Sequence, residues 1–214
     1  MKTPRTVQEA RQIQLRLQKQ VRIAPLRRRP AFIAGADAAF SATRVFAAAS
    51  LFTYPDLRHV EDAYADAPLL FPYIPGLLTF REGPAILKAV RNLSRKPDVV
   101  LFDGQGIAHP AGLGIASHLG VLLGIPSIGC AKSRLVGVYA EPGTKRGRWT
   151  DLVYRSAIAG VVLRSRDNVK PLFLSPGHLI DLQTTIEIVV QSLGRFRLPE
   201  PLRKADALSK QARK

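Results

Sequence analysis

Two aspartates occupy positions where a charge is costly. Asp37 is the only charged residue in the apolar run 33–40, and Asp103 directly follows the apolar run 99–102. An ionised carboxylate on a buried strand is unfavourable unless a cation or hydrogen bonds compensate it. If the two runs are adjacent strands of one sheet, a divalent cation would offset both charges. Oxygen-only ligands favour Mg²⁺, with Mn²⁺ as a substitute, over zinc.

Other interpretations of the acids stay open on spacing alone. Each aspartate would also fit a strand end that pairs with one of the many arginines. Glu82 precedes Gly83-Pro84 at a predicted strand-to-helix corner. There it is a candidate third ligand or general base, but a first-turn acid favoured by the helix dipole explains it more simply.

Two glycine-rich turns resemble nucleotide-binding loops but lack their full patterns. The turn 104–109 has no third glycine and no acid about twenty residues further on, so a dinucleotide-binding fold is excluded. In the run 124–133, Cys130 and Ala131 separate the last glycine from Lys132, which breaks the P-loop spacing. A glycine turn directly after Asp103 would still let a nucleic-acid backbone or a base approach closely.

The charge balance indicates a polyanionic partner. Lys and Arg total 32 against 16 acids, a net charge of +16 in 214 residues. Nucleic acid is the first candidate and an anionic membrane surface the second. Cys130 is the only cysteine, which excludes a disulfide framework and a cysteine-based zinc cluster. The absence of a long apolar run predicts a cytoplasmic protein without a membrane span.

The periodicity of apolar residues predicts a mixed α/β domain. Strands are expected first, then strands alternating with helices, which favours a mixed central sheet flanked by helices over a doubly wound one. The expected strands are 31–40, 45–54, 59–67, 99–102, 127–130, 158–164 and 171–174, and the expected helices are 7–23, 83–93, 111–123, 181–193 and 201 onward.

Ordered sequence strings resemble those of the endonuclease V family over about residues 5–210. The most specific is FPYIPGLL at 71–78, followed by FREGP at 80–84. The others follow in family order: GAD at 35–37, DGQG at 103–106 with HP at 109–110, GIASH at 114–118, GCAKSRL at 129–135, SPGH at 175–178 and RLPEP at 197–201.

The resemblance implies an RNase H-like fold and Mg²⁺-dependent hydrolysis of a phosphodiester bond. The family nicks DNA at the second phosphodiester bond 3′ to a deaminated base such as deoxyinosine, produces 5′-phosphate ends and leaves the base in place. Inosine in RNA stays open as the main substrate, as does the number of metal ions. We expect a monomer that forms a single nuclease domain over residues 1–214, with an N-terminal helix 5–23 and a basic C-terminal helix 201–214 packed on it.

The resemblance also assigns catalytic roles. Asp37 and Asp103 match the metal-binding aspartates, and Glu82 matches the third catalytic acid. Lys132 falls at the scissile phosphate, where an ammonium offsets developing charge. Tyr73 falls on the wedge residue that fills the space left by the flipped nucleotide; without the string around it, a core tyrosine would be the simpler interpretation.

The remaining assignments concern the substrate pocket and the C-terminus. His109 is the best candidate for a contact to the cleaved strand. The roles of His118 and His178 stay open; apart from the resemblance, both would be hydrogen-bonded structural histidines. Asp206 stands where some members carry a histidine, and we interpret it as a substitute catalytic acid. The residues expected around the base pocket are Gly76, Leu78, Gly104, Gly106 and Ile115.

Two rival functions remain at this point. One is a different RNase H-like nuclease, such as a junction resolvase or a ribonuclease that acts on hybrids; it needs the carboxylates but no Pro-Tyr-Ile-Pro wedge. The other is a nucleic-acid-binding protein that has lost catalysis, against which the retention of the acids and Lys132 argues.

Overall fold

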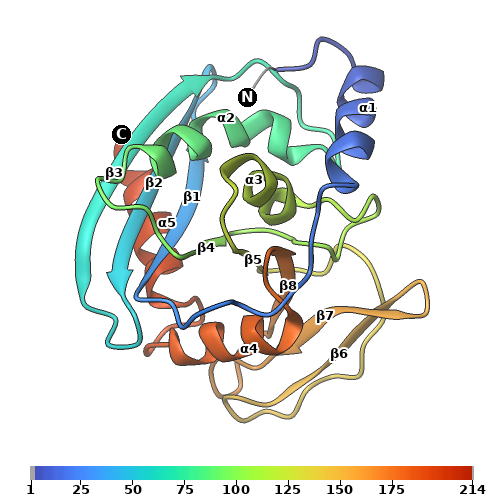
Figure 1. Ribbon diagram of the computed structural model, residues 1–214, viewed down its shortest axis with the longest axis vertical. Coiled ribbons are helices and arrows are strands. Elements are labelled where there is room, and N and C mark those ends of the chain that lie inside the picture. Colours follow the sequence, from blue (N-terminus) through green and yellow to red (C-terminus); the bar gives the residue numbers. More distant parts are fainter. Residues whose placement is uncertain (1–2, 214) are drawn as a thin grey trace.

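The computed structural model describes residues 3–213, and within them the strands form one eight-stranded mixed sheet (Figure 1). The strand order is β3-β2-β1-β4-β5-β8-β7-β6. β4 runs parallel to both β1 and β5, whereas the other neighbours are antiparallel. The strands are β1 (Phe32–Phe40), β2 (Arg44–Thr53), β3 (His59–Pro68), β4 (Val99–Phe102), β5 (Ser127–Ala131), β6 (Trp149–Tyr154), β7 (Ala157–Leu163) and β8 (Leu172–His178).

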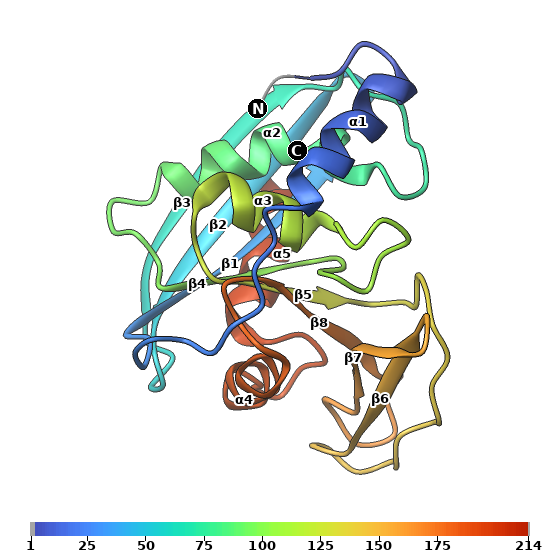
Figure 2. The same cartoon turned by 45° about the vertical axis from the view of Figure 1, so that its right-hand side comes forward.

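Helices cover both faces of this sheet, which confirms the predicted RNase H-like α/β class (Figures 1 and 2). α2 (Leu78–Arg91) and α3 (Ile115–Leu123) share one hydrophobic core with the sheet, and α4 (Leu182–Gln191) and α5 (Glu200–Ala212) contribute to a second core. The first helix, α1 (Val7–Gln18), packs on α3. No helix within residues 3–213 has both the length and the apolarity that a membrane crossing requires.

β4 explains how the two cores are separated. Successive side chains of a strand point to opposite faces. Val100 and Phe102 therefore pack with α2 and α3, while Val99 and Leu101 pack on the side of α4 and α5. All four residues are buried, as expected for a parallel strand covered on both faces.

The start of α2 differs from the prediction. Gly83-Pro84 was expected to begin a helix, but α2 begins at Leu78 and contains Pro84 in its interior. The first turn is held by packing, because Leu77 and Phe80 are buried in a small cluster with Phe71. That burial outweighs the single backbone hydrogen bond that Pro84 removes.

Other bounds differ from the prediction as well, and one strand was missed. α1 ends at Gln18, so the predicted helix 5–23 continues as an extended linker. α3 begins only at Ile115, after a glycine-containing loop, and the edge strand β6 was not predicted. An edge strand is half exposed, so its apolar pattern is weak. α5 begins at Glu200 and its described part ends at Ala212; the predicted last residue, Lys214, lies outside the described residues.

Candidate active site

The parallel pairing of β1 with β4 brings the first two aspartates together. Ala36 is paired with Phe102, and Asp37 and Asp103 directly follow these two residues in the chain. The two aspartates therefore lie side by side where β4 ends, on adjacent strands of one sheet, as the sequence predicted.

α5 adds a third carboxylate from the far end of the chain. This helix packs on β1 and β2 and carries Asp206. Carboxylate oxygens of Asp37, Asp103 and Asp206 all lie within 4.8 Å of one another. These three residues, here called the acidic cluster, form a site that can hold a metal ion.

Two lysines offset part of the negative charge of the acidic cluster. The Lys132 ammonium contacts Asp103 and donates to Oδ1 of Asp206 at 2.9 Å. Lys210, one turn further along α5, donates to Oδ2 of Asp206 at 2.5 Å. Burial alone raises the pKa of Asp206, but the hydrogen bonds from the two lysines outweigh it and hold that pKa below its ordinary value. The same carboxylates outweigh desolvation at Lys132 and raise its pKa.

Asp37 is left with the least compensation. Desolvation by burial, followed by repulsion from Asp103, raises its pKa from 3.8 to about 7, and Lys132 offsets only part of this. No ion pair to Asp37 is found within residues 3–213. A carboxylate in this position gains most from a bound cation.

Glu82 lies in the interior of α2, and its side chain is buried. Desolvation, and then the charges of Asp37 and Asp103, raise its pKa well above the ordinary value. No acid occupies the first turn of α2, so the helix-dipole interpretation of Glu82 was wrong. The electrostatic influence of the two aspartates associates Glu82 with the acidic cluster instead.

Tyr73 stands on a loop before α2 with 68% of its surface exposed, which rules out a core tyrosine. The backbone around it is anchored. Gln14 of α1 donates to the carbonyl oxygen of Gly76 at 2.9 Å, and Arg81 donates to that of Phe71 at 3.1 Å. An exposed aromatic ring therefore projects from a restrained loop.

Of the five residues predicted around a base pocket, two contact each other and the other three have separate surroundings. A Cβ atom on Gly104 would lie 2.5 Å from Cγ2 of Ile115, so these two are in contact. Gly76 lies beside His109, and Leu78 is half-buried at the start of α2. A Cβ atom on Gly106 would lie 2.0 Å from the carbonyl oxygen of Pro176, so close packing within the fold already explains this glycine.

The three histidines near these loops are buried. His109 accepts from the backbone amide of Ala111, and His178 accepts from that of Arg22. His118 differs from expectation: within the described chain neither ring nitrogen has a hydrogen-bond partner, and the ring packs edge-on against Phe80. Burial lowers the pKa of His109 and of His118 to about 4, so both are neutral at neutral pH.

Sequence reasoning missed two residues that support the cluster. Lys210 has a sequence signal, because it lies four residues after Asp206 and so on the same helix face. Arg197 donates to the carbonyl oxygens of Lys132 and Pro171, each at 2.7 Å, and so fixes the backbone that carries the lysine. No local pattern reveals that contact across 65 residues.

Comparison with known proteins agrees with this geometry. The sequence model of the Endonuclease V family matches residues 15–207. A curated endonuclease V of Geotalea uraniireducens is 50% identical over 200 residues, which cover 94% of this chain and 86% of the relative.

Solved structures of the same family match the fold. The endonuclease V of Streptomyces avermitilis superposes with a TM-score of 0.92 at 38% identity, covering 98% of this chain and 94% of that one. The endonuclease V of Ciona intestinalis, in complex with a 24mer DNA containing an inosine followed by a ribo-adenosine, gives 0.84 at 25% identity and 96% coverage of both chains. The relatives and the family match decide against the two rival functions: this chain belongs to the endonuclease V family and is a nuclease.

Proposed function

We propose that this protein is a Mg²⁺-dependent DNA repair endonuclease that nicks a strand at the second phosphodiester bond 3′ to deoxyinosine or another deaminated base. The observation that carries the proposal is the acidic cluster with Lys132 across it, in a chain of the endonuclease V family. We also propose that the chain acts as a monomer and as one nuclease domain.

The donor set of the cluster fits the proposed metal. Three carboxylates offer oxygen ligands only, which suit Mg²⁺ or Mn²⁺. The raised pKa of Asp37 supports the same assignment, because its charge has the least compensation from the protein. Asp37 and Asp103 would hold the ion, with Asp206 as the further oxygen donor. When bound, such an ion lowers the pKa of a water molecule and stabilises the leaving oxygen.

The neighbouring side chains would do the remaining work of the site. The Lys132 ammonium lies between two of the carboxylates, where it can offset negative charge at the cleaved phosphate. Glu82, with its raised pKa, binds its proton more tightly than an ordinary glutamic acid. We assign it to proton transfer or proton holding next to the acidic cluster.

Recognition of the deaminated base would use the loop before α2. Extruding a base costs a few kcal/mol, and an aromatic ring on a stiff loop replaces part of the lost stacking. The exposed ring of Tyr73 between Pro72 and Pro75 supports this wedge role. The complex of the Ciona relative with inosine-containing DNA supports the choice of substrate. We keep His109 as a candidate for contact to the cleaved strand and assign the base pocket to Gly76, Leu78, Gly104, Gly106 and Ile115.

Cleavage of matched strands tests the proposal. Single-stranded and duplex substrates would contain deoxyinosine, inosine in RNA or no lesion, each with and without Mg²⁺. We expect a nick in the deoxyinosine strand only with Mg²⁺, at the second bond 3′ to the lesion and with a 5′-phosphate end. Cleavage of the lesion-free strand at an equal rate, or a nick at another bond, would contradict the assignment. Faster cleavage of the RNA strand would make inosine in RNA the main substrate.

A further inference from the structure

A second concave surface lies away from the acidic cluster. It is a cavity of about 780 Å³ between the linker that follows α1, the loop before β4 and the turn between α3 and β5. Its cationic lining residues are Arg22, Arg27, Arg28 and Lys96, and we call this surface the basic groove.

The charge of the basic groove is poorly compensated. Asp98 is the only acid in its lining, and it is fully engaged: it pairs with Arg28 at 3.0 Å and accepts from the backbone amides of Ala31 and Phe32. Arg22, Arg27 and Lys96 are exposed and make no ion pair within residues 3–213. Three cationic side chains are therefore free to meet an anion.

The walls of the basic groove are held in place before any ligand arrives. The carbonyl oxygen of Arg22 accepts from the amide of Leu179 at 2.6 Å, and Asp98 fixes the other end of the linker. The lining also contains four prolines, which restrict the backbone: Pro25, Pro30, Pro97 and Pro126. Binding there costs little ordering of the chain.

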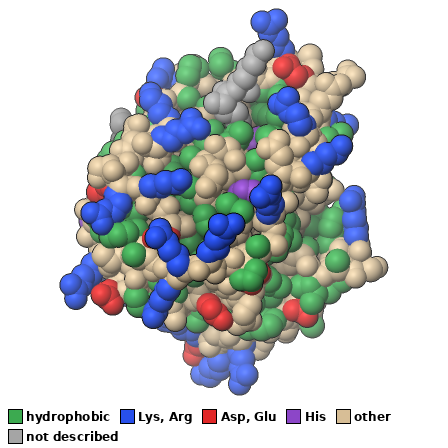
Figure 3. All heavy atoms as spheres, in the orientation of Figure 1, with side chains coloured by type: hydrophobic (Ala, Val, Ile, Leu, Met, Phe, Trp, Pro, Cys, Tyr) green, Lys and Arg blue, Asp and Glu red, His purple; other side chains and the backbone are tan. Residues whose placement is uncertain are grey.

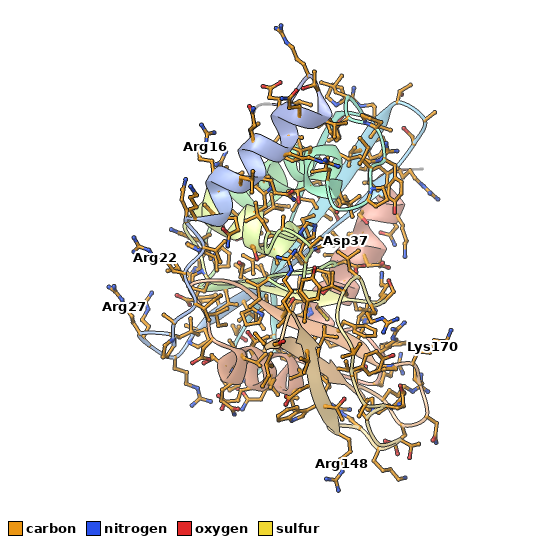
Figure 4. All side chains as sticks on the ribbon, turned by 90° about the vertical axis from the view of Figure 1, so that its right-hand side faces the viewer. Arg16, Arg22, Arg27, Asp37, Arg148 and Lys170 are labelled. Carbon is orange, nitrogen blue, oxygen red and sulfur yellow. The ribbon has the colours of Figure 1, made fainter. Side chains whose placement is uncertain are left out.

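The position of the basic groove separates it from catalysis. Asp98, in the basic groove, directly precedes β4, and Asp103, in the acidic cluster, directly follows it. The two residues are five positions apart, which corresponds to about 16 Å along the strand. Figure 4 shows Arg16, Arg22 and Arg27 along one side of the molecule, with their side chains pointing away from Asp37. Figure 3 shows Lys and Arg side chains spread over the face that is viewed there.

We propose that the basic groove is a second binding site for the sugar-phosphate backbone of nucleic acid, independent of the base at the acidic cluster. Flexible cations on a stiff concave wall suit a chain of phosphates, and each neutralised phosphate releases counterions and adds affinity. Such a site would hold undamaged stretches of nucleic acid while Tyr73, on the loop before α2, tests bases. The inference rests on the proposed function only in taking nucleic acid as the partner.

Salt-dependent binding to a lesion-free duplex of about 30 base pairs tests this inference without any cleavage. The variant Arg22→Gln/Arg27→Gln/Lys96→Gln removes three exposed cations and leaves the backbone contacts of the linker intact. Each lost phosphate contact lowers the slope of log K against log salt by about 0.9. We expect the slope to fall by about 2.7 for three contacts.

Two further variants control for net charge and folding. Arg148→Gln/Arg155→Gln/Lys170→Gln removes as many exposed cations elsewhere, at positions of which Figure 4 labels two. We expect its slope to change by less than about 1. Arg22→Lys/Arg27→Lys/Lys96→Arg keeps the charge and should keep the wild-type slope. Unfolding temperatures of all three variants report on the fold.

Equal slopes for the two neutralised variants would overturn the proposal, because affinity would then follow net charge and not the groove. The single-turnover rate on a saturating deoxyinosine strand should be unchanged in the groove variant. If the wild-type protein failed to cut that strand, the proposed function would fail, while the binding comparison would still decide on the groove.

Discussion

Gly35 of β1 lies directly against the backbone of Pro201 at the start of α5. A Cβ atom on Gly35 would stand 2.2 Å from the carbonyl carbon of Pro201, a distance that no real side chain tolerates. Asp37 is two residues beyond Gly35 on the same face of β1, and Asp206 is five residues, or about 1.4 helical turns, beyond Pro201. The missing side chain thus lets α5 approach closely enough to add its carboxylate to the acidic cluster.

We expect Gly35→Ala to push α5 away from β1. Overpacking of this kind costs about 1–3 kcal/mol of the free energy of unfolding. Binding of Mn²⁺ to the cluster should weaken as well, because Asp206 moves. Denaturant unfolding and metal titration measure the two effects. Gly143→Ala is the matched control, since its Cβ would meet only the Arg148 side chain at 3.5 Å. Wild-type values for both properties of Gly35→Ala would contradict this account of the site.

Metal affinity should depend on pH through Asp37. Its pKa in the folded protein is about 7, and a metal ion must displace the proton. Affinity for Mg²⁺ should therefore rise about tenfold per pH unit below pH 7 and level off above it. Calorimetric titration between pH 6 and 8 measures this. An affinity that is constant over this range would show that Asp37 is already ionised without the metal.

The raised pKa of Asp37 also predicts how the free energy of unfolding of the metal-free protein depends on pH. Because the folded-state pKa of Asp37 is raised from 3.8 to about 7, the folded state holds this proton more tightly than the unfolded state. Its contribution to stability is present at low pH and is lost as pH rises from about 4 to about 7. Asp37→Asn should remove this part of the pH dependence. Identical unfolding profiles for the two proteins across that window would be inconsistent with the raised pKa.

Tyr73→Ala tests the wedge. Aromatic stacking on a base is worth roughly 1–3 kcal/mol, so the preference for inosine-containing over undamaged duplex should fall about 5- to 150-fold. The loss should be smaller on single strands, which need less unstacking. Tyr64→Ala is a matched control, because Tyr64 is also exposed but lies on β3. Equal losses on duplex and single strands would indicate a structural tyrosine.

Substitutions of Asp206 test whether this residue is a third metal ligand or a surface acid. Asp206→Ala should lower the cleavage rate at least tenfold, a barrier increase of about 1.4 kcal/mol. Asp206→His should keep appreciable activity and shift the Mg²⁺ to Mn²⁺ preference, because imidazole is the softer ligand. Lys210→Gln removes one hydrogen bond but keeps the carboxylate, so its effect should be smaller. Wild-type kinetics for the alanine variant across a Mg²⁺ titration would remove Asp206 from the site.

Much of the fold was predictable because a strand that is buried on both faces needs a continuous run of apolar residues, which is visible in the sequence. β4 is buried on both faces, and its run of four apolar residues was identified at its observed bounds. The start of α2 was not predictable in this way. Its first turn depends on the burial of Phe71, Leu77 and Phe80 against α1, a contact between distant segments that local propensity does not contain.

The candidate site also has a part that local sequence signals predicted and a part that depends on contacts between distant segments. The proximity of Asp37 and Asp103 was predictable, because each is a costly charge on or directly after an apolar strand. The contribution of Asp206 depended on family resemblance, since an aspartate on a basic helix is usually a solvated residue. The support of Lys132 by Arg197, and the close approach at Gly35, appear only once the chain is folded.

The most direct test of the central claim is single-turnover cleavage of a deoxyinosine strand in Mg²⁺ by Asp37→Ala and Asp103→Ala, with binding measured in parallel. The surplus of Lys and Arg supplies most of the affinity, so both variants should bind the strand nearly as well as wild type. Both should fail to nick it. Near wild-type cleavage by either variant would show that the acidic cluster does not hold the catalytic metal.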